Sequence, residues 1–485
     1  MKKTAFKLSK LIFSVFIGLL VLMGIFMAVL LIALFGEGTI PSFGVYEYFS
    51  SSLINSQSVY FMLSFCLVLP IALLALTLFA LPMAKPLYHR RQLQKMVKAA
   101  QRKLIKEAKK VAKDAEKQSK RVKRMTKTRF PRLKHIDTVQ KKKKSPQYDT
   151  SVTLEEICES FRLYAAGELG LYYSISDIRR FIAGMGISKL LILRGISGTG
   201  KTSLAYAAGE FFGNSSTIVP IQPMWKERSD LIGYFNEFTK KFSESSLLEK
   251  LYEAGGNDDL YITVLDEMNI SRIEYYFAEF LSLLEIPDVS KRYLDVVADF
   301  WDSDPVRLNK GKLLLPENMW FVGTANNDDS TFSISDKVYD RAAIIDLNHK
   351  CEPFSAQGAA GKRISYQQLN VLFEEAQKSY KLSGKNRDNL AKLDAYMSDV
   401  FRVSFGNRIM KQIQNYIPIM CACGGDQLDA LDDLLCRKIL RKLEQLSPAY
   451  VKSEAGNLQV LLDELFGNDR MPQCREYIDK LQKGF

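Results

Sequence analysis

The chain has 485 residues, which is too long for one ordinary domain and predicts two or three. Hydrophobic residues make up 47% of it, and its seven scattered cysteines include no CxxC pair, which argues against a disulfide scaffold or a zinc site and favours reduced thiols. The formal charge of +13 is local: residues 85–144 carry +20, from 24 Lys/Arg and four acids, residues 1–84 carry +2, and residues 145–485 are left with −9.

Two apolar runs near the N-terminus predict a transmembrane hairpin over residues 1–84. Residues 11–35 and 59–84 contain no charge, and each run exceeds the roughly 20 residues that cross a hydrocarbon core. Lysines precede the first run and Lys/Arg follow the second, with none between, so both termini are expected on the cytoplasmic side of an inner membrane. A cleaved signal peptide is the alternative for the first run, but its apolar region would be only about 7–15 residues long.

A basic segment, residues 85–148, follows as a predicted connector. Residues 92–125 are rich in Ala, Lys, Glu and Gln, which are good helix formers, and contain no Gly or Pro. Three interpretations stay open: a solvated helical stalk, contact with anionic lipid head groups, or nucleic-acid binding. Nucleic acid is the least favoured, because no aromatic residue lies among these charges to stack on bases.

The stretch "KLLILRGISGTGKTSLAYAAG", residues 189–209, predicts a phosphate-binding loop. A short apolar strand, residues 190–193, leads into a GxxxxGKT pattern, and a helical pattern begins immediately after it. The loop's glycines let backbone amides approach phosphates, and the helix N-terminus adds positive potential. The predicted nucleotide ligands are Gly195, Ser197, Gly198, Thr199, Gly200, Lys201, Thr202 and Ser203.

Two adjacent carboxylates end a second apolar strand, residues 260–267. At the carboxyl end of a parallel strand they are expected to lie near the phosphate loop. We expect Asp266 and Thr202 to hold Mg²⁺ and Glu267 to polarise the attacking water. A third strand, residues 320–323, leads to Asn326, placed to bond the water and the γ-phosphate, and Arg341 follows as a residue that can complete a neighbour's site.

The C-terminal part has helical patterns without strand patterns over residues 360–450. Leucines and Ile439 recur every three or four residues over 428–446, which predicts an amphipathic helix. An α-helical lid over residues 351–485 is expected, with a last helical piece after residue 446. Aromatic residues of "YYFAEFLSLL", residues 275–284, have helical spacing and are expected to pack in the core.

Together these stretches resemble the AAA+ ATPases, in the clade of McrB-type NTPases, MoxR-type ATPases and dynein-related modules. The matching segments are "ILRGISGTGKTSL", "IQPMWKERSDLIGYFN", "VLDEMNISRIEYYFAEFLSLLE", "LPENMWFVGTANNDDSTFSISDKVYDRA" and "VSFGNRIMKQI", in order over about residues 175–445. The resemblance implies an α/β fold, a P-loop αβα sandwich with a parallel sheet over residues 149–350, followed by the lid.

The resemblance also implies roles by position. Lys201 and Thr202 match the Walker A pair, Asp266 and Glu267 match Walker B, Asn326 matches sensor 1, Arg341 the arginine finger and Arg408 the sensor 2 arginine. Trp225, Asp230 and Tyr234 match a segment that the clade often turns toward its substrate, although Trp225 can equally be a core aromatic. Members form rings, commonly hexamers, so self-association is expected. ATP with Mg²⁺ is the expected ligand, because residues 325–330 depart from the restriction-type pattern and a GTP preference does not carry over; GTP stays an alternative.

Three functional hypotheses follow from the sequence. The first is a membrane-anchored ATPase that remodels or gates an unknown protein partner at the cytoplasmic face, in a bacterial setting such as phage defence. The second is a nucleotide-dependent assembly switch or scaffold for an effector. The third is a McrB-like, GTP-driven nucleic-acid motor that uses the basic connector.

Overall fold

The computed structural model describes residues 128–142, 146–326 and 331–483, together with residues 14, 17, 18, 21, 24 and 68. Two compact units, residues 1–117 and 118–485, divide the chain, and the second is described here. The predicted spans, residues 11–35 and 59–84, lie almost entirely outside the described residues, as does the predicted helix over 92–125. Within the described part of the chain, no helix combines the length and apolar character needed to cross a membrane.

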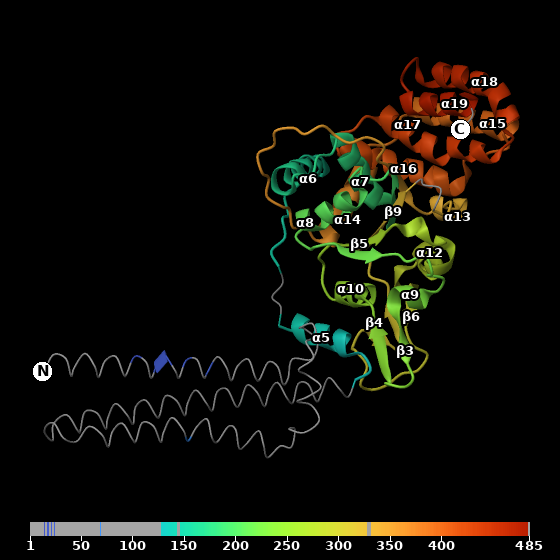
Figure 1. Ribbon diagram of the computed structural model, residues 1–485. Coiled ribbons are helices and arrows are strands. Elements are labelled where there is room, and N and C mark those ends of the chain that lie inside the picture. The colour runs from blue at the N-terminus through green and yellow to red at the C-terminus, as the bar shows by residue number, and fades with distance from the viewer. Residues whose placement is uncertain are drawn as a thin grey trace, which may run out of the picture. The chain divides into compact units, whose positions relative to one another are not determined.

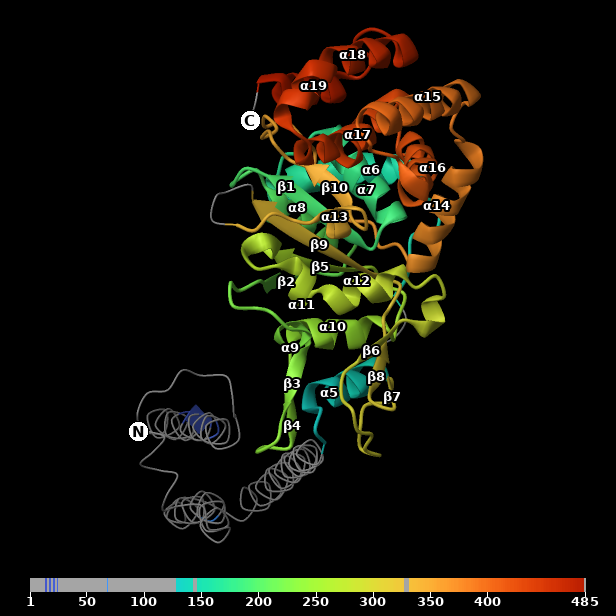
Figure 2. The ribbon, with the colours of Figure 1, turned by 90° about the vertical axis from the view of Figure 1, so that its right-hand side faces the viewer.

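A five-stranded parallel sheet forms the centre of the second unit. Its strands lie in the order β10-β1-β9-β5-β2 (Figure 2). The three strands predicted from the sequence are confirmed as β1, β5 and β9, and β2 and β10 extend the sheet at its two edges. The bounds are β1 Leu190–Gly195, β2 Thr217–Pro220, β5 Tyr261–Asp266, β9 Met319–Asn326 and β10 Ala343–Asp346.

Helices cover both faces of this sheet (Figure 1). Successive side chains of a strand point to opposite faces, so Leu191 and Leu193 join one hydrophobic cluster while Leu190 and Ile192 join the other. Because both faces of the sheet are buried, the sequences of its strands are continuous apolar runs. The first face is covered by α6 Leu154–Leu169, α7 Ile175–Ile187 and α8 Lys201–Phe211, and the second by α10 Ser246–Ala254, α11 Ile273–Tyr276 and α12 Ala278–Glu285.

Two small antiparallel sheets, which the sequence analysis did not predict, are inserted on the side of α10 and α12. The first is a hairpin of β3 Gly233–Asn236 and β4 Lys241–Glu244, preceded by α9 Arg228–Ile232. The second joins β6 Tyr293–Asp295, β7 Leu308–Asn309 and β8 Lys312–Leu314. At the hairpin tip, Phe238 is 99% exposed.

The packed domain begins before residue 149, which corrects the predicted boundary of the connector. Helix α5, Pro131–Gln140, buries Leu133 fully, and Phe130 stacks on Phe242 of β4 at 5.0 Å. Just before it, Arg129 is buried, donates to the Asp304 carboxylate at 2.6 Å and lies 4.5 Å from the Trp301 ring. Residues 128–140 therefore belong to the domain and not to a solvated stalk.

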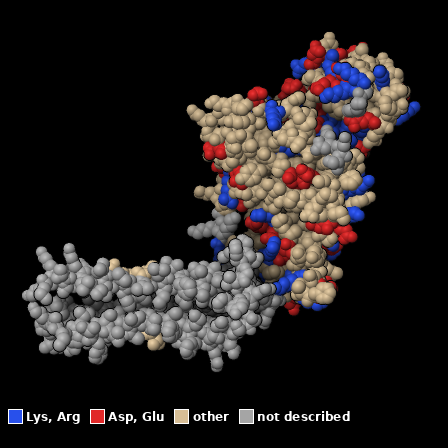
Figure 3. All heavy atoms as spheres, viewed as in Figure 1, with Lys and Arg blue, Asp and Glu red and all other residues tan. Residues whose placement is uncertain are grey.

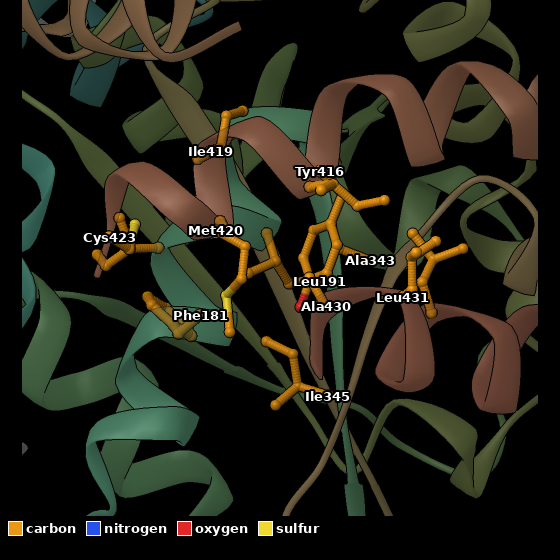
Figure 4. Close-up of a cluster of buried hydrophobic side chains, with 14 of the residues drawn as sticks. Phe181, Leu191, Ala343, Ile345, Tyr416, Ile419, Met420, Cys423, Ala430 and Leu431 are labelled. Carbon is orange, nitrogen blue, oxygen red and sulfur yellow. The ribbon is translucent and has the colours of Figure 1, made fainter. Parts of the chain in front are cut away.

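The C-terminal part is helical, as predicted. The expected helix over 428–446 is shorter, because α17 ends at Lys438 and a 3-10 segment follows. Tyr416 and Met420 of α16 lie beside Leu191 and Ala343 of the sheet, so these helices share one core with the sheet (Figure 4). The elements are α14 Tyr366–Ser379, α15 Gly384–Val400, α16 Gly406–Ala422, α17 Gln427–Lys438, η3 Leu440–Gln445, α18 Pro448–Phe466 and α19 Pro472–Lys483.

Candidate functional site

The loop between β1 and α8 has the conformation that the glycine pattern predicts. Gly198 and Gly200 have φ of 79° and 88°, values that favour glycine, and a Cβ on Gly195 would lie 2.3 Å from the Leu347 carbonyl oxygen. Ser197 is exposed, whereas Thr199 is buried and donates to the Ile196 carbonyl at 3.1 Å. The chain then enters α8 directly, so the first amides of an 11-residue helix face this loop.

Lys201 extends back along the same loop. Its ammonium group donates to the carbonyl oxygens of Gly195 at 3.0 Å and Ile196 at 2.7 Å, and only 6% of the residue is exposed. A buried cation held inside a ring of backbone groups is suited to binding the outer phosphates of a nucleotide.

Thr202, at the start of α8, and Asp266, at the carboxyl end of β5, lie together as the sequence predicts. The Thr202 hydroxyl donates to Asp266 Oδ1 at 2.7 Å. The Thr324 hydroxyl donates to the same oxygen at 2.8 Å and accepts from the Glu267 amide at 2.8 Å. Sequence reasoning missed Thr324, although its place two residues before Asn326 on β9 puts both on one face of the strand.

Glu267 sits at a sharp turn directly after β5. It has φ of 53°, a conformation that is costly for a residue with a Cβ, and its side chain is exposed. The next residue, Met268, is fully buried against Gly323 of β9, where an added Cβ would lie 1.8 Å from its sulfur. This packing fixes the turn and hence the direction of the Glu267 side chain.

Asn326 ends β9 next to the loop. Its Cα pairs in register with that of Gly195, and its backbone is held by the Asn269 side chain, which donates to the Asn326 carbonyl at 2.8 Å. Asn269 is 4% exposed and was not predicted as a site residue. The sequence signal that could have identified it is the "DEMN" run, residues 266–269, because Asn269 ends this run and holds the backbone of Asn326 at the end of β9.

A cavity of about 740 Å³ opens beside the loop, between Ile196, the chain after β10 and the C-terminal helices. Tyr173 closes one side of the loop, because its hydroxyl donates to the Gly200 carbonyl at 2.9 Å. Burial raises the pKa of Tyr173 well above its ordinary value, so the hydroxyl stays protonated and able to donate. The polar lining includes Ser174, Ser176, Asn348, Arg437, Arg441 and Tyr477.

Arg341 and Arg408 lie elsewhere, at the amino edge of the sheet. Arg341 precedes β10, and both guanidinium groups bind the carboxylate of Glu285 at the end of α12, with 2.5 Å from Arg341 Nη2 to Glu285 Oε2. These hydrogen bonds, first that of Arg341, lower the pKa of Glu285. The three residues line a second cavity, of about 580 Å³. The structure therefore separates the two arginines from Lys201 by the length of the strands.

The donor set at the carboxyl edge fits Mg²⁺. The described residues contain no group of three or more His, Cys, Asp or Glu side chains that can hold a metal. Mg²⁺ does not require one, since it is usually held by one or two protein oxygens together with substrate phosphates and water. Thr202 and Asp266, 2.7 Å apart beside the loop, supply that pair.

The residues singled out in the segment "IQPMWKERSDLIGYFN", residues 221–236, lie in different surroundings. Asp230 accepts from the amides of Lys226 and Glu227 and so caps α9. Trp225 is partly buried edge-on against Tyr276, with 6.2 Å between ring centroids. Tyr234 is 57% exposed on β3. Tyr275, expected in the core, is 56% exposed, because the helix there breaks between α11 and α12.

Comparisons with known proteins give limited matches. A profile described as a domain of unknown function, DUF8727, matches residues 363–485, which begin just before α14. No curated protein matches the chain. Two solved structures are similar. The first is a candidate ATPase from Cytophaga hutchinsonii, with 13% identity, coverage of 68% of this chain and 94% of that one, and a TM-score of 0.35. The second is a full-length MCM homologue from Methanopyrus kandleri, with 9% identity, coverage of 58% of this chain and 59% of that one, and a TM-score of 0.33. At these scores neither identifies a family, so the functional argument depends on the site.

Proposed function

We propose that this chain is an AAA+-type ATPase that binds ATP with Mg²⁺ at the carboxyl edge of its sheet and hydrolyses it. The observation that carries the proposal is the contact between the Thr202 hydroxyl and Asp266, next to a loop that buries Lys201. A phosphate loop, a metal-binding pair and an adjacent free carboxylate form the set of groups that phosphoanhydride hydrolysis needs.

Binding is assigned to the loop and to the start of α8. The amides of residues 198–203 and the Lys201 ammonium group hold the phosphates, and the positive end of the helix adds to their field. Mg²⁺, when held by Thr202 and Asp266, neutralises charge on the outer phosphates. Ser174, Asn348 and Tyr477 of the adjoining cavity are placed to contact the rest of the nucleotide.

Hydrolysis is assigned to Glu267 with Asn326. The exposed Glu267 carboxylate orients the attacking water and takes up its proton, and the Thr324 hydroxyl, which accepts from the Glu267 amide, holds the turn in place. Asn326, positioned by Asn269, donates a hydrogen bond to the water or to the terminal phosphate. A general base of this kind contributes about 10²–10⁴ in rate.

Arg341 and Arg408 are assigned to a second copy's nucleotide. Their place at the amino edge keeps them away from their own loop, so they can stabilise phosphate charge only across an interface between copies. This arrangement supports assembly into a closed ring, with a hexamer as the proposed state.

We propose that the protein uses the free energy of ATP hydrolysis to act on a protein partner at a membrane surface. The apolar runs of residues 11–35 and 59–84 and the basic residues that flank them support an inner-membrane anchor with this domain in the cytoplasm. Basic and acidic side chains are interspersed over the face of the domain in Figure 3. That mixture, together with the net −9 of residues 145–485, does not favour the nucleic-acid motor.

Turnover by the full-length chain in detergent tests the proposal. We expect Mg²⁺-dependent release of phosphate from ATP, reduced at least about 100-fold by Glu267→Gln. Unchanged turnover in that variant would contradict the assignment. Slow turnover combined with nucleotide-dependent assembly would instead favour the assembly switch, and competition between ATP and GTP decides the base preference.

A further inference from the structure

Helix α17 and the 3-10 segment η3 that follows it place three basic side chains, those of residues 437, 438 and 441, against the segment that carries Arg341. The most deeply placed is Lys438, which is 5% exposed. Its ammonium group donates to the carbonyl oxygens of Tyr339 and of Ala342, the latter at 2.6 Å. These two carbonyls flank Arg341 in the chain, so a single buried amino group, which can donate hydrogen bonds in either protonation state, ties both sides of that residue to the lid.

Arg437 joins the same helix to β10, the strand that follows Arg341. It donates to the Ile344 carbonyl at 2.9 Å and contacts the Asp346 carboxylate at 3.2 Å. Asp346 is also bonded by Arg194 of β1 at 2.7 Å, directly before the phosphate loop. Burial raises the pKa of Asp346, but Arg437 and Arg194 outweigh it and lower the pKa, so the carboxylate stays charged.

The other end of the segment is held as well. Arg441 forms an ion pair with Asp336 at the start of α13, Asp336–Tyr339, and its guanidinium carbon lies 3.8 Å from the centre of the Tyr339 ring. Gln412 of α16 donates to the Asp340 carbonyl at 3.0 Å. The C-terminal helices thus hold residues 336–346 along their whole length.

Helix α17 and η3 also border the candidate nucleotide site. Arg437 and Arg441 line the cavity of about 740 Å³ beside Ile196, while Lys438 points away from that cavity to the Arg341 segment. Two consecutive elements, α17 and η3, therefore contact both the surroundings of the subunit's own nucleotide site and the backbone beside Arg341.

We propose that α17 is a latch through which the lid positions Arg341, so that the nucleotide bound in one copy sets how well that copy serves the next copy's site. The inference rests on the proposed function, because it takes Arg341 to act on a second copy. When nucleotide in the cavity moves the lid, the buried contacts of Lys438 transmit that movement to residues 339–342, which lie before the sheet strand β10. Lys438 is a positioning residue, since it acts through the backbone beside Arg341 and not on the phosphate.

Mixed assemblies test the latch. Lys438→Met removes the donors but keeps an unbranched apolar stem, and Lys452→Met, at an exposed position on α18, is the matched control. We expect Lys438→Met alone to lower ATP turnover at least about tenfold while ATP binding and assembly size stay as in the wild type. Lys438→Arg, which retains donors, should recover part of the loss.

The decisive readout is complementation between copies. Glu267→Gln chains cannot hydrolyse but carry a correctly held Arg341, whereas Lys438→Met chains keep Glu267. Mixing the two should raise turnover several-fold above the sum of the separate preparations, because the first supplies Arg341 to the second. Absence of any gain, wild-type turnover by Lys438→Met, or loss of its ATP binding would overturn the latch.

A second variant keeps the test valid if Lys438→Met fails to fold. Asp336→Asn breaks the ion pair with Arg441 at a partly exposed position and should show the same complementation with a smaller loss. If the wild-type protein does not hydrolyse ATP, the proposed function itself is contradicted. Active wild-type protein with unaffected Lys438→Met and Asp336→Asn variants would overturn the latch alone.

Discussion

The two edges of the parallel sheet are built in different ways. At the carboxyl edge, Thr202, Asp266 and Thr324 lie within one chain of hydrogen bonds of 2.7–2.8 Å, and each comes directly from the end of a strand or the start of a helix. At the amino edge, Arg341 and Arg408 come from distant segments and meet only because both bind Glu285. The contacts described at the first edge join residues that lie close to one another. At the second edge, the two arginines pair with Glu285 and lie a strand's length from Lys201.

The largest expected effect is on ATP turnover and comes from a substitution at the amino edge of the sheet. Arg341→Ala should lower ATP turnover about 10³-fold, because an arginine of this kind stabilises transition-state charge, and it should leave ATP binding by its own chain unchanged. Arg387→Ala, at an exposed position on α15, is the control. If Arg341→Ala reduces ATP binding as much as ATP turnover, Arg341 acts in its own subunit's site. The two edges of the sheet would then not differ in whether they serve their own chain or a second copy.

Glu267→Gln removes the carboxylate that we assign as the general base at the carboxyl edge of the sheet. We expect turnover to fall about 10²-fold or more through loss of the base, with ATP binding retained. Phosphate release and equilibrium binding measured on one preparation separate the two quantities. Glu352→Gln, on an exposed loop, should behave as the wild type; a loss of binding in Glu267→Gln would assign the carboxylate to the ligand shell instead.

Gly323→Ala sharpens the comparison by disturbing only the packing beneath the carboxyl edge. The new Cβ would overlap Met268, and overpacking of this kind costs about 1–3 kcal/mol of unfolding free energy. Gly456→Ala, in the middle of α18 with open space around it, should instead stabilise the protein by about 0.5–1 kcal/mol. Chemical denaturation measures both. Equal stability of the two variants would mean that Met268 is free to move aside.

The last prediction concerns the pH dependence of stability at the lid latch. Burial lowers the pKa of Lys438 to about 7, whereas the unfolded chain keeps an ordinary lysine pKa of about 10.4. Between these values the unfolded chain binds one more proton, so this residue makes the unfolding free energy rise with pH, by at most about 1.4 kcal/mol per pH unit. Lys438→Met should flatten that rise between pH 7 and 10, and Lys452→Met should not; parallel curves for all three proteins contradict the assignment.

Short-range sequence patterns predicted the carboxyl edge because its residues follow apolar strands within one or two positions. Lys201, Asp266 and Asn326 could be placed near one another from the rule that parallel strands end together. Thr324 was missed because it lies inside an apolar strand, although its spacing of two from Asn326 places both on one face. Asn269 was missed although it ends the "DEMN" run.

The amino edge and the insertions could not be predicted in the same way. The Glu285 contacts join residues 56 and 123 positions apart, and no local periodicity encodes such a meeting. The strands of the two inserted sheets are two to four residues long, too short for an alternating pattern. Arg129 was counted with the basic connector, since only the fold shows that Asp304 neutralises it.

Calorimetric titration of the full-length chain with ATP, with Mg²⁺ and then with EDTA, tests the central claim most directly. The account predicts binding to the wild type that tightens when Mg²⁺ is present, loss of binding in Lys201→Ala, and loss of only the Mg²⁺ dependence in Asp266→Asn. Binding by Lys201→Ala equal to that of the wild type, or no binding by the wild type at all, would contradict it.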